Sequence, residues 1–243
     1  PVPGEAPWSK CLPFGQLRGS AVTPPLGENG SMVEQSMWMN KVEADPSHSH
    51  WYVQRFRKLA EAGHDLSGEA RLVDAMAVRG SRILDAGCGP GRVGAELASR
   101  GHQVVGVDVD PVLIDAARED HPGATWVVSD LAELDLAAEG ITDPFDLVVS
   151  AGNVVTFLAP STRRLVLANL TEVLAEDGRI VVGFGAGRGY LVEDFFADAG
   201  AAGLVEDLRL ATWDLRPWTE DSGFLVAVLR HVGESKFSQG AKG

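Results

Sequence analysis

The sequence predicts an α/β fold: a doubly wound, mostly parallel seven-stranded sheet with a C-terminal antiparallel hairpin and an N-terminal helical cap. Two observations support this prediction. Short apolar runs alternate with helical segments over residues 81–199, which is typical of βαβ units in a parallel sheet. The last two apolar runs, 204–215 and 223–231, are about seven residues apart. A parallel return needs a crossover of a dozen or more residues, so these two runs must pair antiparallel.

The individual elements follow from periodicity and from residues that begin or end helices. Asp110 before Pro111 is a typical helix start, and Gly101 and Gly200 are placed to end the helices before them. The expected strands are 81–86, 103–108, 125–129, 145–150 and 179–184, followed by the closing pair. The expected helices are 50–62, 68–77, 91–99, 111–119, 161–175 and 190–199.

Composition and charge exclude several classes of partner. The chain has 243 residues and a net charge of −13, from 34 acidic and 21 basic residues, and so acidic a chain repels nucleic acids. No apolar run approaches the roughly 18 to 20 residues that span a bilayer, so we expect no membrane partner. Two cysteines cannot form a disulfide framework, and the N-terminus lacks a signal-peptide pattern, so we expect a cytoplasmic protein.

The most informative motif runs from residue 83 to residue 91, Ile-Leu-Asp-Ala-Gly-Cys-Gly-Pro-Gly. A buried strand ends in Asp85, and the alternating glycines Gly87, Gly89 and Gly91 open a helix. Glycines let the backbone turn sharply and approach a ligand, and the acid suits a ligand with a cationic amino-acid head. This segment resembles motif I of the class I (Rossmann-like) S-adenosylmethionine (SAM)-dependent methyltransferases, of the bacterial small-molecule or uncharacterised type.

The same stretch also matches a second pattern. Residues 89–94 fit G-x-G-x-x-G, the dinucleotide fingerprint, so an NAD(P)-binding Rossmann enzyme is an alternative. In that interpretation the strand would end three residues before the first glycine of the fingerprint. Asp85 would also repel the phosphates, which favours the methyltransferase interpretation.

The resemblance to methyltransferases implies further cofactor contacts. Asp108 would hold the ribose and Val109 would pack on the adenine. Asp130 would accept a hydrogen bond from the adenine amino group, and the Leu131 N–H would reach a ring nitrogen of the adenine. The structural alternative for Asp130 is a helix cap. The remaining cofactor residues that we expect are Tyr52, Arg55, Gly87, Cys88, Gly89, Ala151 and Gly152.

The acceptor side of the site is less defined. Related enzymes that methylate amines carry an Asn/Asp-Pro-Pro-Tyr-type tetrapeptide after the fourth strand, whereas residues 151–154 read Ala-Gly-Asn-Val, which counts against base or peptide-amide methylation. Asn153 either faces the acceptor or caps a turn, and Arg188 either binds an anionic acceptor or is solvated. His48 and His50 are too isolated for a metal site, so we expect no metal.

These observations predict an enzyme that transfers a methyl group from SAM to an unidentified, small-molecule acceptor by direct displacement. The cofactor motifs demand no catalytic residue, because the methyl is already activated. The alternative is a SAM-binding sensor or regulatory protein without turnover. We expect a disordered arm over residues 1–31, a helical cap over 32–79, a SAM-binding domain over 80–231 and a disordered tail over 232–243.

Overall fold

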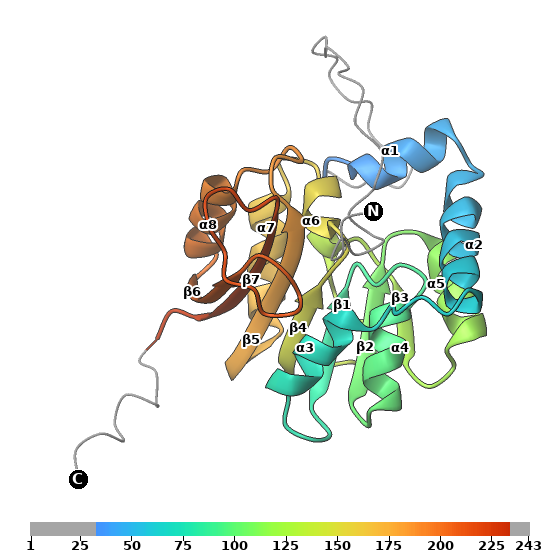
Figure 1. The fold of residues 1–243 in the computed structure, drawn as a ribbon, viewed down its shortest axis with the longest axis horizontal. Coiled ribbons are helices and arrows are strands. Elements are labelled where there is room, and N and C mark those ends of the chain that lie inside the picture. The colour runs from blue at the N-terminus through green and yellow to red at the C-terminus, as the bar shows by residue number, and fades with distance from the viewer. Residues whose placement is uncertain (1–32, 234–243) are drawn as a thin grey trace.

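The computed structural model describes residues 33–233, so the predicted arm and nearly all of the predicted tail lie outside the described residues. Within this range, seven strands form one mixed sheet in the order β3-β2-β1-β4-β5-β7-β6 (Figure 1). The strands are β1 (Arg82–Ala86), β2 (Gln103–Asp108), β3 (Thr125–Val128), β4 (Phe145–Ser150), β5 (Leu174–Gly185), β6 (Leu204–Leu210) and β7 (Phe224–His231). The first five pair in parallel, and β7 lies antiparallel between β5 and β6, which confirms the predicted fold class.

Helices cover both faces of the sheet. One face carries α3 (Gly68–Met76), α4 (Arg92–Ser99) and α5 (Pro111–Asp120). The other face carries the short 3-10 helix η2 (Leu131–Glu133), α7 (Arg163–Glu172) and α8 (Val192–Ala201). The central strands are buried on both sides, as a parallel sheet requires: in β1, Ile83 faces one helical layer and Leu84 the other.

Three further helices complete the described part. The helix α6 (Val154–Phe157) follows β4, and α1 (Met37–Ala44) and α2 (His48–Glu61) precede the sheet. The sequence predicted two helices before the first strand and missed α1, whose N-cap is Ser36: its hydroxyl accepts from the Met39 N–H at 3.2 Å. In Figure 1, α2 stands beside α5 at one edge of the sheet.

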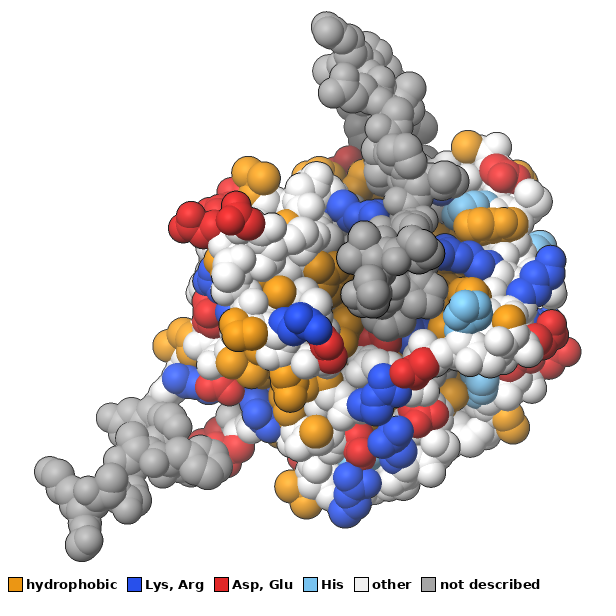
Figure 2. Space-filling model, viewed as in Figure 1, with side chains coloured by type: hydrophobic (Ala, Val, Ile, Leu, Met, Phe, Trp, Pro, Cys, Tyr) orange, Lys and Arg blue, Asp and Glu red, His pale blue; other side chains and the backbone are white. Residues whose placement is uncertain are grey.

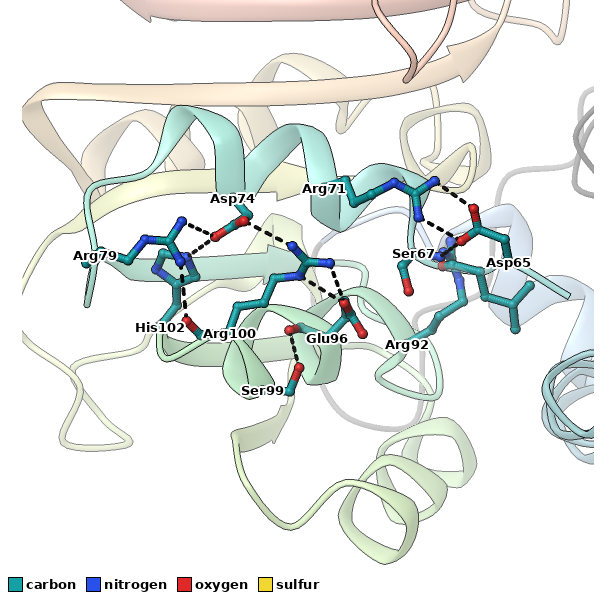
Figure 3. A network of polar contacts seen from close by, with 11 residues as sticks. Asp65, Ser67, Arg71, Asp74, Arg79, Arg92, Glu96, Ser99, Arg100 and His102 are labelled. Carbon is teal, nitrogen blue, oxygen red and sulfur yellow. Dashed lines mark hydrogen bonds and ion pairs between the residues drawn. The ribbon is translucent and has the colours of Figure 1, made fainter. Parts of the chain in front are cut away.

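The segment predicted as one cap, 32–79, is divided in the structure. Ala70, Leu72 and Val73 of α3 are buried in the same cluster as Val93 and Leu97 of α4. Asp74 of α3 also pairs with Arg100 at 3.0 Å and accepts from His102 Nε2 at 3.0 Å (Figure 3). The helix α3 is therefore part of the layer on the sheet, and a cap that moves could include only α1 and α2.

Two predicted boundaries in the second half of the chain were wrong. The helical period from residue 161 continued through Leu174, but α7 ends at Glu172 and Leu174 begins β5, where it pairs with Phe145 of β4. The helix predicted to end before Gly200 continues to Ala201, and the left-handed residue that follows it is Gly203, with φ 83°. In the first case pairing with β4 overrides helical periodicity, and in the second a different glycine takes the left-handed conformation that ends a helix.

The predicted strand 204–215 was also too long. β6 stops at Leu210, where the chain bends: the Ala211 N–H donates to the Arg216 carbonyl at 2.8 Å, and Leu215 has a φ of 72°. A branched aliphatic residue rarely adopts this left-handed conformation. The connection from β6 to β7 therefore spans residues 211–223, and it packs its Trp213 ring onto Gly183 of β5.

Candidate functional site

The glycine loop, residues 87–91, joins β1 to α4 at the carboxyl end of the sheet. Gly87, Gly89 and Gly91 all have positive φ, at 80°, 56° and 84°. Only glycine adopts such values without strain, so the alternating pattern is a backbone requirement. Ligands of open α/β sheets bind at this edge, which makes the loop the natural centre of the site.

Trp126 of β3 explains three glycines in and beside the glycine loop, of which the sequence analysis assigned Gly91 to the ligand alone. A Cβ on Gly106 would lie 2.3 Å from the Trp126 ring, and a Cβ on Gly91 or Gly94 would lie 2.8 or 3.0 Å from it. These glycines make room for the indole beneath the loop. Gly89 differs, because the nearest atom to an added Cβ is Tyr52 Cε1 at 3.7 Å, so this part of the loop stays open.

Asp85 is nearly completely buried below the glycine loop, with 2% of its surface exposed. Its carboxylate accepts a hydrogen bond from the Gly94 N–H at 2.8 Å, so it also holds the first turn of α4. Burial raises the pKa of Asp85 to about 7. The sequence analysis expected this acid to contact the ligand and missed its link to α4.

Asp108 at the end of β2 lies on the other side of the same loop. Its Oδ2 accepts from the Gly89 N–H at 2.9 Å, and its Oδ1 accepts from the Asp110 N–H at 3.0 Å. Removal from water raises the pKa of Asp108 to about 6. The structure thus brings Asp108 to the open part of the loop, and the adjacent Val109 is half-buried at the same edge.

Asp110 is a helix cap, as predicted, but it does more than cap. Its Oδ1 accepts from the Val112 N–H at 2.9 Å at the start of α5. Its Oδ2 accepts from Trp38 Nε1 of α1 at 2.9 Å and from the Ser49 hydroxyl of α2 at 2.5 Å. One carboxylate therefore joins both N-terminal helices to the sheet, a long-range contact with no local signal in the sequence.

The ends of β3 and β4 complete the edge. Asp130 accepts from the Ala132 N–H at 2.9 Å and so caps η2, which is the structural alternative considered for it, and Leu131 is buried beside it. The Ser129 N–H donates to the Asp108 carbonyl at 3.0 Å, which holds the ends of β2 and β3 together. The structure therefore places Asp108 and Asp130 at neighbouring strand ends.

Residues 151–153 form the turn after β4. Ala151 is buried and Gly152 is exposed, with a φ of 76° and no atom within 4 Å of an added Cβ. Asn153 also has a positive φ, at 70°, and its Oδ1 accepts from the Gly185 N–H at 2.7 Å. Its side chain therefore joins the ends of β4 and β5, a structural role that the sequence analysis did not predict.

The two predicted residues of α2 have different surroundings. Tyr52 lies against Gly89 and packs edge-on to Trp38 of α1, with ring centroids 5.2 Å apart. The Arg55 guanidinium instead lies 5.8 Å from the Trp51 ring and 5.9 Å from the Phe56 ring of its own helix. The structure therefore brings Tyr52, and not Arg55, onto the glycine loop.

A buried ion pair beside the loop was not predicted. Arg92, the first residue of α4, pairs with Glu69 of α3 at 2.6 Å and donates to the Leu66 carbonyl, and its guanidinium lies 5.5 Å from the Phe56 ring. Glu69 is 1% exposed. This pair ties the helix after the glycine loop to both α3 and α2.

Cys88 contributes only its backbone to the loop surface. Its thiol is buried in a small cluster with Ile114, Ala117 and Trp126, and burial raises its pKa well above the ordinary value. A thiol in such surroundings is a poor nucleophile. Within residues 33–233, no group of three His, Cys, Asp or Glu side chains is placed to hold a metal ion.

The charge of this edge distinguishes between the two candidate cofactors. Two acids with raised pKa values, Asp85 and Asp108, flank the glycine loop, and both would be stabilised by a cationic or hydrogen-bond-donating ligand. SAM has a cationic amino group, a cationic sulfur and two ribose hydroxyls. A pyrophosphate would meet the same acids with like charge, so the residues present fit SAM and not NAD(P).

Comparison with known proteins is decisive. Residues 83–178 match the family model described as Methyltransferase domain. The crystal structure of a TehB-like SAM-dependent methyltransferase from Corynebacterium glutamicum is 51% identical, with a TM-score of 0.73, and the match covers 77% of this chain and 100% of that one. This chain belongs to the class I SAM-dependent methyltransferases. It is therefore an enzyme that uses SAM, and the NAD(P) alternative is wrong.

More distant relatives of this methyltransferase share the fold or part of the sequence. The Magnesium-protoporphyrin O-methyltransferase of Rhodobacter capsulatus is 34% identical over 129 residues, which are 50% of this chain and 52% of that protein. The CcbJ methyltransferase from Streptomyces caelestis has a TM-score of 0.62 at 20% identity, covering 68% of this chain and 90% of that one, which shows the fold alone. The methyltransferase spans about half or less of the length of the curated relatives it matches.

Two further observations concern the helices and the charged surface of the methyltransferase. None of the helices in the described range is long and apolar enough to cross a bilayer. On the face shown in Figure 2, acidic side chains lie beside the basic ones over α3 and α4, consistent with the pairs Arg71–Asp65 and Arg79–Asp74.

Proposed function

We propose that this methyltransferase transfers the methyl group of SAM to a small-molecule acceptor at the carboxyl edge of its sheet. The observation that carries the proposal is the convergence of Asp85, Asp108 and the open Gly89 on one loop, with Tyr52 lying over it. Bound SAM supplies a methyl group on a positively charged sulfur. The protein then needs to position the acceptor and to exclude water, and no residue has to activate the methyl.

Different residues at the carboxyl edge of the sheet contact different parts of the cofactor. Asp108 accepts hydrogen bonds from the ribose hydroxyls, beside Val109, and Asp130 with Leu131 faces the adenine. The loop residues Gly87, Cys88 and Gly89 contact the cofactor through their backbone, and the turn Ala151–Gly152 faces its amino-acid end. Asp85 is buried beneath this end and stabilises its positive charge through space.

A small acceptor is supported by the acidic surface and by the named acceptor of one relative. A net charge of −13 disfavours a nucleic-acid acceptor. The Rhodobacter relative is named for a porphyrin, a small molecule. The acceptor of this chain is a proposal that rests on those two observations.

Calorimetry tests the cofactor assignment. We expect SAM and S-adenosylhomocysteine to bind to the wild-type protein, and NAD and NADP to give no heat above dilution. Incubation with SAM and a small-molecule extract, followed by mass spectrometry, should yield S-adenosylhomocysteine and a methylated product. Tight NAD binding without SAM binding would contradict the assignment, and methylation confined to added RNA or protein would contradict the small acceptor.

A further inference from the structure

A hollow of about 320 Å³ lies beside the cofactor edge, at the ends of β4 and β5. Three segments far apart in sequence enclose it: the turn after β4, the loop after β5 and the connection from β6 to β7. The residues that line it are Asn153, Gly185, Arg188, Ala211, Thr212, Ser222, Gly223 and Phe224.

The hollow is adjacent to the proposed methyl position. Asn153 directly follows Gly152, which we place at the amino-acid end of SAM. The hydrogen bond from the Gly185 N–H to Asn153 Oδ1 fixes the two strand ends that form this wall, and Asn153 is 5% exposed. An acceptor in the hollow therefore lies next to the cofactor without entering the cofactor's own site.

The lining of the hollow combines one charged side chain with a mostly apolar surface. Arg188 is the one charged residue among the described residues that line the hollow, and most of the lining surface is apolar, including Phe224. The Arg188 side chain folds over Gly185: a Cβ on Gly185 would lie 2.8 Å from its Cδ and Nε. Guanidinium groups carry five N–H donors and can bind a carboxylate with two parallel hydrogen bonds, so an arginine in this lining is chemically suited to a carboxylate ligand.

The same lining lacks a proton acceptor. Among the described residues that line the hollow there is no carboxylate, imidazole, amine or phenol, and the two hydroxyls, Thr212 and Ser222, do not act as bases near pH 7. An ammonium ion or an alcohol would have to lose a proton for the transfer to take place. An acceptor that is already an anion at neutral pH needs no such group.

We propose that the acceptor is a carboxylic acid with an apolar body, that Arg188 binds its carboxylate, and that the product is a methyl ester. This proposal rests on the proposed function above, and it names the acceptor class. The apolar body packs against Phe224 and the neighbouring small residues. Arg188 is thereby a substrate-binding residue that determines specificity for an acid over its amide.

The transfer balances without a further reactant. One carboxylate oxygen forms a bond to the methyl carbon, the bond from that carbon to sulfur breaks, and the electron pair stays on sulfur. The negative carboxylate and the positive sulfonium become a neutral ester and a neutral thioether, and no proton moves. Desolvating an ion pair that is neutralised during the reaction favours this step in an apolar hollow.

The first experiment measures binding with defined probes. Benzoate and its neutral counterpart benzamide are titrated into protein saturated with S-adenosylhomocysteine, for the wild type and for Arg188→Gln, Gly185→Ala and Arg216→Gln. We expect benzoate to bind at least about tenfold more tightly than benzamide, because hydrogen bonds between two charged groups are stronger than those to a neutral amide. Arg188→Gln should abolish the difference, and Gly185→Ala should reduce it by displacing the Arg188 side chain without removing its charge.

Arg216→Gln is the matched control. Arg216 has an exposed side chain in the connection from β6 to β7, pairs with Asp214 at 3.5 Å and is not among the residues that line the hollow. It should leave benzoate binding unchanged. Equal binding of benzoate and benzamide, absence of benzoate binding, or equal losses in Arg188→Gln and Arg216→Gln would overturn the proposal. Failure of S-adenosylhomocysteine to bind in the first step would instead overturn the proposed function itself.

The second experiment identifies the bond. SAM with an isotopically labelled methyl group is incubated with the protein and an extract of small metabolites, and the products are treated with mild alkali. A methyl ester releases the label as methanol, whereas methyl groups on nitrogen, carbon or sulfur are retained. We expect alkali-released label to fall at least about tenfold in Arg188→Gln. Label that stays with the products after alkali would show another acceptor class.

Discussion

From β1 to β3, hydrogen bonds between motif residues join the strand ends to one another. From β4 to β7, Asn153 joins the ends of β4 and β5, and a hollow lined by three loops lies beside them. In the first region, the Asp108 carboxylate accepts hydrogen bonds from the Gly89 N–H and from the Asp110 N–H. The Trp126 ring fills the space below the glycine loop. In the second region, the connection 211–223 turns through Leu215 in a left-handed conformation. We call the strand ends of β1 to β3 the cofactor half, which hydrogen bonds hold in place. We call the strand ends of β4 to β7 the acceptor half, which is assembled from distant segments.

This division agrees with what the two ligands require. The cofactor is the same in every turnover, so its half can be fixed by local hydrogen bonds. Acceptor chemistry depends on which side chains the loops present, such as Arg188 and Phe224. Loops tolerate sequence change better than the elements that they join, so specificity is expected in the second region.

The strongest test of the division is Asp108→Ala. Two ribose hydrogen bonds to a charged acceptor contribute about 3 kcal/mol or more together, so we expect SAM affinity to fall at least about 100-fold in calorimetry. Asp115→Ala is the charge-matched control, because this acid is exposed on α5, where it pairs with Arg118 at 3.1 Å. Similar SAM affinities for the two variants would remove Asp108 from the cofactor half.

Asp110→Ala tests how firmly the N-terminal helices are joined to that half. The change removes a helix cap and leaves the Trp38 and Ser49 donors without their buried partner. We expect the free energy of unfolding to fall by about 3 kcal/mol in a denaturant titration. Asp110→Asn, which keeps the size of the side chain and its acceptor oxygen, should lose less. A loss of only about 1 kcal/mol in Asp110→Ala would mean that the residue is a cap alone.

Gly106→Ala tests the packing beneath the glycine loop. The added Cβ would lie 2.3 Å from the Trp126 ring, so the core must shift, at a typical cost of about 1–3 kcal/mol. Gly123→Ala is a control at a glycine with no atom within 4 Å of an added Cβ. Trp126→Leu combined with Gly106→Ala should cost less than the sum of the two single changes. Simple additivity in this cycle would show that the two residues do not share this space.

The pH dependence of SAM binding has a defined sign. The folded pKa values of Asp85 and Asp108, about 7 and about 6, lie above the ordinary value. Their contribution to the stability of the unliganded protein is therefore present at low pH and is lost as the pH rises through these values. A cationic ligand favours the ionised acids, so SAM affinity should rise about fivefold or more between pH 5 and pH 7.5. Asp85→Asn should flatten this profile, and an unchanged profile in this variant would contradict the assignment.

The smallest expected signal concerns α2. If α1 and α2 close over the cofactor, S-adenosylhomocysteine should slow amide hydrogen exchange over residues 48–58 as well as in the glycine loop. The structure already places Tyr52 on Gly89, so we expect added protection without a large rearrangement. Protection of the loop alone would confine the N-terminal helices to a structural role.

Local periodicity and capping predicted elements of both halves, whereas contacts between distant segments could not be predicted from the sequence. The strand at 103–108, the Asp110 cap and the closing antiparallel pair depend on local periodicity and capping, and all three are found in the structure. Trp126 under Gly106, Asp110 with Trp38, and the hollow around Arg188 depend on which distant segments meet. No spacing within one motif records such contacts, so they became visible only in three dimensions.

The shared carboxylate of Asp110 also constrains how the chain is made. Its partners Trp38 and Ser49 precede it by 72 and 61 residues. The helices α1 and α2 therefore emerge from the ribosome well before Asp110 does. During this interval the apolar side of α2, including Val53, has no partner on α5. The N-terminal helices therefore dock late, after β2 and the start of α5 have been synthesised, even though they precede both elements in the chain.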